Sequence, residues 1–196
     1  MFSKLSPERQ TTDLTEAMQR WGFLENPPPA AALRWIATFL QAYGGELANV
    51  EDAFVPVSEL RAEACVIPAL ELERLRSREV LFFLDSVSQY VDAQPELRGV
   101  PVEADIGEIA KEFGIDPGTA LDAVRMGLSG KATGPALPLL FVLLGHDRIM
   151  MRIGAVNSHL LHGRGLEPIK YGPDGKPFEP IRATKPVDDR PSETSA

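Results

Sequence analysis

Three neighbouring stretches decide the fold: DIGEIAKEFGI at residues 105–115, AVRMGLSGK at 123–131 and GPALPLLFVLLGHDRIMMRI at 134–153. Asp116 followed by Pro117 is typical of a helix start, because the carboxylate accepts unpaired backbone N–H groups and proline fits the first turn. Gly130 and Gly145 are typical of helix ends. The three stretches therefore predict helices over residues 105–113, 116–129, 134–144 and 147–161.

The chain before residue 105 is predicted to be helical as well. The clearest segment follows Ser77, whose hydroxyl can cap a helix. Apolar residues recur there at helical spacing, at Val80, Leu81, Leu84, Val87 and Val91. Helices are expected over residues 12–21, 29–43, 58–64, 68–76 and 77–93. No alternation of strands with helices is visible, so the sequence predicts an all-α helical bundle.

Proline and glycine divide the chain further. Residues 94–101 hold two prolines and a glycine and are the expected linker between two helical subdomains, residues 1–93 and 102–162. Residues 163–196 form a tail rich in Pro and Gly, which we expect to be partly disordered. Within the tail, residues 169–178 are expected to form a short β-hairpin around a Gly-Pro-Asp-Gly turn.

Charge and composition narrow the class of protein. The formal net charge is −8, with ten Lys and Arg against 21 Asp and Glu in residues 1–122 and ten against seven thereafter. An acidic chain is a poor general binder of nucleic acid, which argues against DNA as a partner. The single cysteine excludes an internal disulfide, and the apolar runs are too short to span a membrane. We expect a cytoplasmic protein without a membrane partner.

Sequence motifs for catalysis and for cofactors are absent. The chain has no phosphate-binding loop, no dinucleotide-binding glycine motif, no Cys-x-x-Cys and no Gly-x-Ser-x-Gly. His159 and His162 are three residues apart, but a two-histidine pair with no third ligand nearby is a weak metal signal. The sequence therefore predicts no catalytic residue, no metal and no cofactor.

The stretch 105–153 resembles the C-terminal part of the anticodon-binding domain of bacterial glutamyl-tRNA synthetases. That family has Arg-x-Ala-Leu-Thr-Gly on a helix, then a Gly-Pro or Ser-Pro helix start, a Leu-Gly-Lys-x-Arg turn and a further Arg-Ile or Arg-Leu. The matching residues here are Arg125, Leu128, Gly130, Gly134, Pro135, Leu144, Gly145, Arg148, Arg152 and Ile153. The departures are Gly127 for Ala, Ser129 for Thr and His146 for Lys, the last of which removes a positive charge.

The resemblance implies a stand-alone homologue that binds tRNA or assists an aminoacyl-tRNA synthetase in trans. The His-Ile-Gly-His and Lys-Met-Ser-Lys-Ser signatures of the synthetase catalytic domain are absent, so we expect no aminoacylation by the chain itself. The expected RNA-binding residues are Arg125, Lys131, Arg148 and Arg152. Pairing of these side chains within the protein is the competing explanation. The alternative function is a protein-interaction module that lost RNA binding and docks through the tail after His162.

The first prediction concerns catalysis. Purified protein given total tRNA, glutamate, ATP and pyrophosphate is expected to charge no tRNA and to show no ATP–pyrophosphate exchange, because no motif in the chain can hold a triphosphate. The measurement is the transfer of radiolabelled pyrophosphate into ATP. Exchange that survives a further purification step would contradict the prediction.

Overall fold

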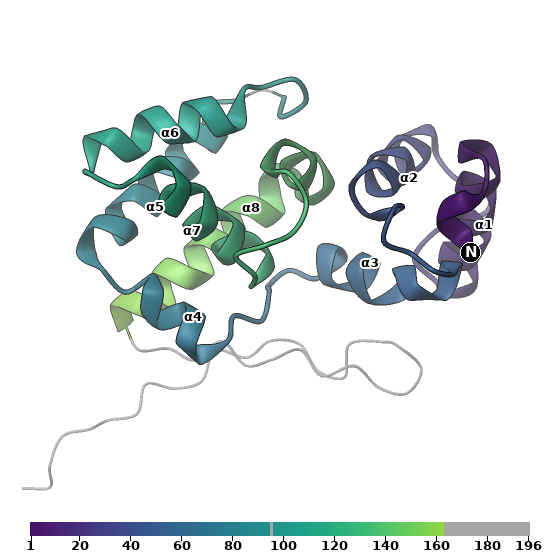
Figure 1. Ribbon diagram of the computed structural model, residues 1–196, viewed down its shortest axis with the longest axis horizontal. Helices are drawn as coiled ribbons and strands as arrows, with labels where there is room; N and C mark the ends of the chain where they lie inside the picture. The colour runs from purple at the N-terminus through teal and green to yellow at the C-terminus, as the bar shows by residue number, and fades with distance from the viewer. Residues whose placement is uncertain (95, 163–196) are drawn as a thin grey trace, which may run out of the picture.

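The computed structural model describes residues 1–94 and 96–162, and these residues form helices without any strand (Figure 1). The all-α prediction is confirmed for this part of the chain, while the expected hairpin and tail lie outside it. The helices are α1 (Pro7–Arg20), α2 (Ala30–Tyr43), α3 (Phe54–Arg61), α4 (Ala69–Arg74), α5 (Arg78–Asp92), α6 (Val102–Glu112), α7 (Pro117–Ser129) and α8 (Leu137–His162), with short 3-10 helices η1 (Phe2–Lys4) and η2 (Val50–Ala53).

Side-chain caps set the start of several helices. The Ser77 hydroxyl accepts a hydrogen bond from the Val80 N–H at the start of α5, as the sequence predicted. Asp116 does the same for the Thr119 N–H at the start of α7. Helix α1 begins at Pro7, earlier than expected, because Ser6 and Pro7 form the same kind of start signal.

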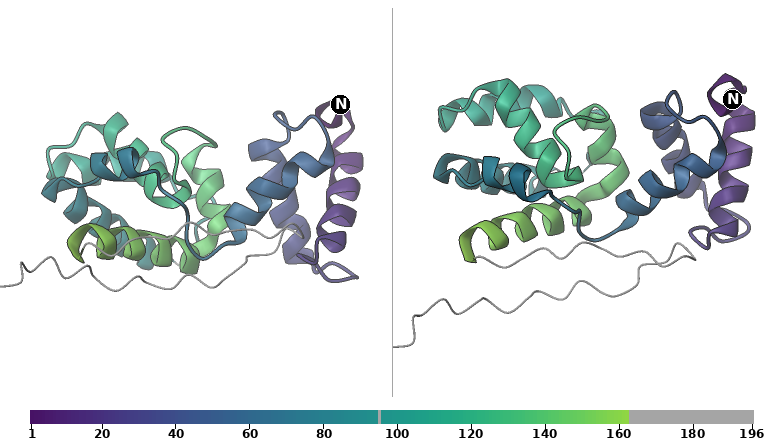
Figure 2. Two further views of the ribbon diagram at one scale, coloured as in Figure 1. Left: turned by 90° about the horizontal axis from the view of Figure 1, so that it is seen from below. Right: turned by 60° about the horizontal axis from the view of Figure 1, so that its bottom comes forward.

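Helix α8 changes direction at Gly145. This residue has φ 72° and ψ 166°, which is outside the helical region, so α8 consists of two helical segments joined at a kink. The sequence predicted this break. Figure 2 shows the consequence, since the two segments run in different directions.

The helices gather into two lobes joined by residues 62–68 (Figures 1 and 2). Helices α1, α2 and α3 form the N-terminal lobe, and α4 to α8 form the C-terminal lobe. Helix α2 packs against α8, and the Trp35 indole N–H donates a 2.8 Å hydrogen bond across this contact to the Leu143 carbonyl. The lobes are therefore in direct contact as well as covalently linked.

The boundary between the lobes differs from the expected one. Residues 94–101 join α5 to α6, and both helices pack against α8 in the C-terminal lobe. Gly99 and Pro101 lie between two packed helices, and a turn uses the same residue types as a domain linker. The division at 94–101 stays a prediction that the packing of α5 does not favour.

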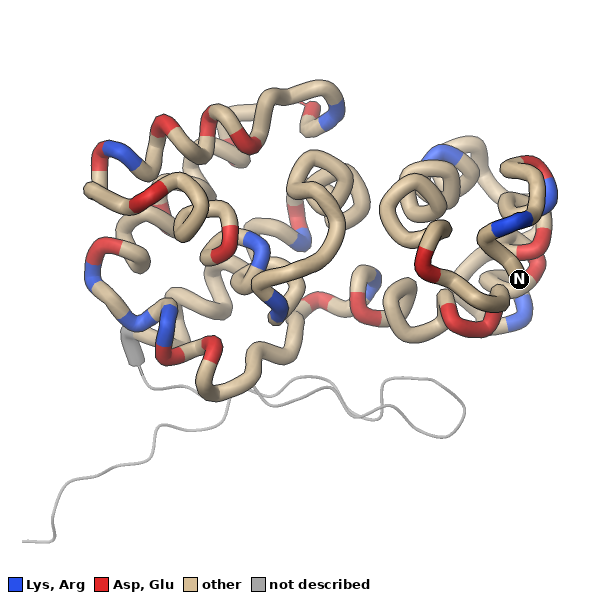
Figure 3. The backbone as a smooth tube through the Cα atoms, viewed as in Figure 1, with Lys and Arg blue, Asp and Glu red and all other residues tan. Residues whose placement is uncertain are grey.

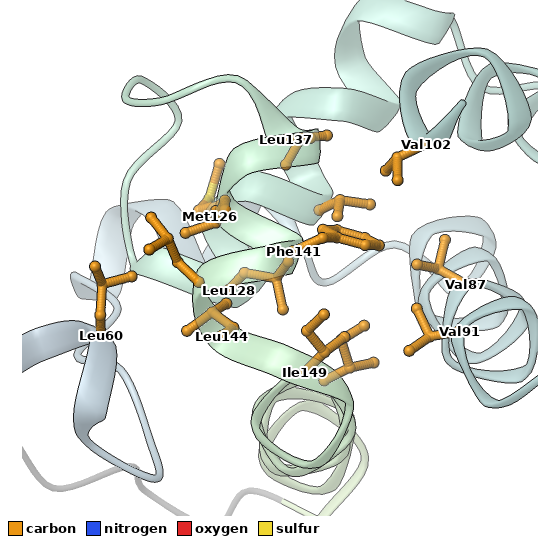
Figure 4. Packing of buried hydrophobic residues seen from close by; sticks show 14 of the residues in the cluster. Leu60, Val87, Val91, Val102, Met126, Leu128, Leu137, Phe141, Leu144 and Ile149 are labelled. Carbon is orange, nitrogen blue, oxygen red and sulfur yellow. The ribbon is translucent and has the colours of Figure 1, made fainter. Parts of the chain in front are cut away.

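The C-terminal lobe is built around Phe141 in the first segment of α8. This side chain is fully buried, and Figure 4 shows it facing Val87 and Val91 of α5, with Val102 of α6 nearby. Burial of a side chain of this size contributes roughly 2–3 kcal/mol. The core thus fixes α8 relative to α5 and α6, and it leaves the end of α7 to meet the N-terminal lobe.

Gly130 ends α7 at the point where α7 meets the segment between the lobes. Its φ of 75° is left-handed, and its N–H donates to the Met126 carbonyl. A Cβ at this position would overlap the carbonyl oxygen of Val66. Glycine is therefore required here for two reasons, its backbone conformation and the close approach of another backbone.

The second prediction follows from that contact. Replacing Gly130 with Ala is expected to lower the free energy of unfolding by at least about 3 kcal/mol, because it adds left-handed strain to a clash with backbone. Gly127→Ala is the matched control, since Gly127 lies within α7 and a Cβ added there would meet nothing within 4 Å. The control is expected to gain about 0.5–1 kcal/mol. Urea denaturation measures the free energy of unfolding of both variants. Equal values for the two variants would refute the close contact between Gly130 and the Val66 backbone.

Candidate nucleic-acid interface

Arg125 holds the loop between α7 and α8. Its Nη1 donates to the Asp122 carboxylate and to the Ala132 carbonyl, both at 3.1 Å, and its Nε donates to the Pro135 carbonyl at 3.4 Å. Only 15% of the side chain is exposed. Its contacts therefore fix the shape of the loop that carries Lys131.

Arg152 joins the ends of two helices. It is only 2% exposed, and its guanidinium donates hydrogen bonds to the carbonyls of Leu128 in α7 and of Glu59 and Ala62 at the end of α3. The last carbonyls of a helix lack partners within the helix and carry partial negative charge, so a buried cation is favourable there. This contact ties the C-terminal lobe to the N-terminal lobe.

Arg148 reaches the same helix end from a more exposed position. Its Nε donates to the Arg61 carbonyl at 3.2 Å, and its Nη1 donates to the Leu144 carbonyl at 3.4 Å. The side chain is half-buried. Arg148 and Arg152 thus share a helix face, as the spacing predicted, but this face packs on α3, and Arg152 is covered.

Lys131 lies on the exposed loop next to α3. Its Nζ is 3.2 Å from a carboxylate oxygen of Glu59, and both side chains are about half exposed or more. Lys131, Arg148 and Arg152 therefore all contact the last turn of α3 and the residue after it, Glu59–Ala62, which we call the α3 end. Arg125 affects the α3 end indirectly, because it holds the loop that carries Lys131.

A groove of about 590 Å³ runs between the lobes beside Lys131. Its wall on the N-terminal lobe carries Glu46, Asp52 and Glu59. A smaller cavity of about 90 Å³ adjoins it, lined by Tyr43 and Cys65 among others. Burial and then the negative charges of Glu59 and Glu46 raise the pKa of Tyr43 to about 12. The groove is therefore acidic, apart from Lys131.

Neither groove nor cavity has the features of a catalytic site. Burial raises the pKa of the Cys65 thiol, and its Sγ donates to the Gly127 carbonyl at 3.3 Å, so the reactive thiolate is disfavoured. Within residues 1–94 and 96–162, no three His, Cys, Asp or Glu side chains are grouped to hold a metal ion. None of the helices in these two ranges meets the length and hydrophobicity that a membrane span requires.

One cation at the α3 end was not predicted from the sequence. The Arg61 guanidinium lies over the Phe23 ring, 5.5 Å from its centroid. Burial, and then the charge of Arg148, lower the pKa of Arg61. Arg61 lies outside the motif that pointed to the other arginines, and Phe23 is 38 positions away, so the sequence offered no signal for this pair.

Acidic side chains cover other parts of the surface. Figure 3 shows Asp and Glu along α6 and basic residues near the junction of the lobes. Glu103, Glu108 and Glu112 of α6 are all exposed. A polyanion would be repelled there, and the α3 end is the more favourable place for it.

The fold is that of an all-helical anticodon-binding domain. A family model described as "Anticodon binding domain" matches residues 35–156, which is more than half of the chain and covers parts of both lobes. The chain belongs to this family, and the resemblance seen in the sequence is confirmed.

The similar proteins are glutamate–tRNA ligases. The chain is 24% identical over 139 residues to the ligase of Listeria monocytogenes serotype 4b, covering 69% of this chain and 28% of that one. It is 26% identical over 132 residues to the ligase of Staphylococcus saprophyticus, covering 66% and 27%. The crystal structure of a glutamate tRNA ligase from Elizabethkingia meningosepticum in complex with its amino acid has the same fold, with a TM-score of 0.67 at 13% identity over 80% of this chain and 30% of that one. This chain thus spans less than a third of each relative.

The third prediction separates the two neighbouring arginines. Arg152→Met is expected to cost about 3–5 kcal/mol of unfolding free energy, because it leaves buried carbonyls of α3 and α7 without their donor. Arg148→Met, on the same helix face but half-buried, is expected to cost about 1 kcal/mol or less, because water can reach its carbonyl partners. Urea denaturation of both variants makes the comparison. Equal losses would mean that the burial of Arg152 has no structural importance.

Proposed function

We propose that this protein binds tRNA as an anticodon-binding-domain homologue and does not aminoacylate it alone. The observation that supports tRNA binding is the family match, which covers parts of both lobes and includes the α3 end. The absence of aminoacylation is inferred from the missing triphosphate-binding motifs and from the small share of the ligases that the chain spans. Assistance to an aminoacyl-tRNA synthetase in trans, in the cytoplasm, is the biological role we infer.

The exposure of two of the four basic residues supports direct contact with phosphates. Lys131 is exposed, and Arg148 is half-buried, so solvent reaches part of each side chain. Arg125 and Arg152 also donate to backbone carbonyls, but they are only 15% and 2% exposed, so solvent reaches little of either side chain. We therefore assign Lys131 and Arg148 to phosphate contacts, and Arg125 and Arg152 to positioning the loop and the α3 end.

A second function is favoured by the acidic wall of the groove. Glu46, Asp52 and Glu59 face an opening of about 590 Å³ that would repel RNA. A basic protein segment would fit this charge. An interaction module of that kind needs no RNA, so tRNA binding distinguishes the two functions.

The fourth prediction tests tRNA binding. Filter binding of total tRNA across a range of salt concentrations is expected to give micromolar or weaker affinity at physiological salt, because the rest of the surface is acidic. Each phosphate neutralised on a single strand contributes about −0.7 to the slope of log K against log salt, so Lys131 and Arg148 contribute about −1.4. The double variant Lys131→Gln, Arg148→Gln is expected to flatten the slope by that amount.

The control is Lys111→Gln, which removes an exposed cation on the acidic helix α6. It should leave the slope unchanged. If wild-type protein retains no tRNA even at the lowest salt concentration, tRNA binding is excluded and the interaction module takes its place. If the double variant binds as wild type does, Lys131 and Arg148 are not the contacts.

A further inference from the structure

Arg61 and Arg148 are neighbours at the α3 end, and neither has an acidic partner within residues 1–94 and 96–162. Arg148 Nε donates to the carbonyl of Arg61, so the two residues are in direct contact. Among the described residues, neither guanidinium forms an ion pair with Asp or Glu. By contrast, Arg9, Arg20, Arg74, Arg76 and Arg125 each have a carboxylate within 3.2 Å.

The surrounding charges do not balance this pair. A helix C-terminus supplies roughly half a negative charge, and the α3 end already receives Arg152. Glu59, the acidic residue of the last turn, is paired with Lys131. Asp147, next to Arg148, contacts His146 at 3.3 Å. A net positive spot therefore remains on an otherwise acidic protein.

Both guanidinium groups are held in place before any ligand arrives. Phe23 lies under Arg61, and its ring is itself stacked on Phe54 with centroids 5.8 Å apart. Arg148 is held by its bonds to two carbonyls. Fixing a side chain in advance reduces the entropy lost on binding. Arg61 and Arg148 touch through the Arg61 main-chain carbonyl, and each carries a preorganised guanidinium group with the planar donor fork that suits a phosphate.

We propose that Arg61 and Arg148 form an oxyanion site that takes a phosphate group, with Phe23 as the positioning residue for Arg61. The identity of the natural ligand, a phosphate of the tRNA backbone, rests on the proposed function, whereas the oxyanion site itself does not. A free phosphate presents the same chemistry. The experiment therefore has one arm for each source.

The first arm is the fifth prediction, which uses inorganic phosphate alone. In protein labelled with nitrogen-15, the Nε–Hε signals of Arg61 and Arg148 are expected to shift on titration and to saturate with one common dissociation constant. Arg61→Gln is expected to weaken the response at Arg148 about tenfold, since one charge-assisted hydrogen bond to the anion is lost. Shifts that grow linearly without saturation, or an unchanged Arg148 response in the variant, would overturn the site.

Arg78→Gln is the matched control. Arg78 lies over the Phe82 ring at 5.4 Å, as Arg61 lies over Phe23, and it also has no carboxylate partner among the described residues. It has no hydrogen bond to a second arginine in that part of the chain, so the phosphate response at Arg61 and Arg148 should be unchanged. A loss as large as that of Arg61→Gln would overturn the pairing. Arg61→Lys serves if the glutamine variant fails to fold, and it is expected to keep the charge but weaken phosphate binding, because the planar fork is lost.

The second arm uses tRNA. Arg61→Gln is expected to flatten the salt slope by about 0.7, and Arg78→Gln to leave it unchanged. Saturable phosphate binding without any tRNA binding would support the site and refute the proposed function. Retained tRNA binding with no phosphate response and no effect of Arg61→Gln would refute the site and leave the function standing.

Discussion

The guanidinium of Arg152 occupies the place where the two lobes meet. It donates to carbonyls at the ends of α3 and α7, and these helices belong to different lobes. Helix ends have unpaired carbonyls that water normally satisfies, and at a packed junction water is excluded. The buried arginine replaces the water for both helices at once. The loop with Lys131, the contact of Arg148 with α3 and the groove between the lobes all depend on the relative position that it sets.

Most residues of the motif shared with the synthetase family help to form this junction between the lobes. Gly130 lets the end of α7 approach the Val66 backbone, and Arg125 shapes the next loop. Gly145 turns α8 so that its second segment brings Arg148 and Arg152 to α3. Most residues of the shared motif thus build the junction, and of its four basic residues Lys131 stays exposed and Arg148 half-buried.

Local signals in the sequence were sufficient for much of the helical pattern. The caps at Ser77 and Asp116 and the break at Gly145 use interactions within a few residues, so they were predictable. The burial of Arg152 was not, because its partner Ala62 is 90 residues away and helical spacing says nothing about which face meets another helix. Long-range placement also explains why α5 and α6, on either side of a stretch with the composition of a linker, pack together, since the apolar face of α5 packs against α8. For the candidate site, the motif predicted four basic residues. The structure was needed to show which of them are accessible to solvent, Lys131 and Arg148, and which are largely covered, Arg125 and Arg152.

Several of the polar contacts between the lobes are directed at main-chain atoms. Trp35 bonds the carbonyl of Leu143, and Arg148 and Arg152 bond carbonyls of α3 and α7. A carbonyl is present whatever side chain its residue bears, so the accepting positions are free to change during evolution provided that the donors are kept. Such an architecture tolerates wide sequence divergence. It offers a physical reason why a chain 13% identical to a ligase of known structure retains its fold with a TM-score of 0.67.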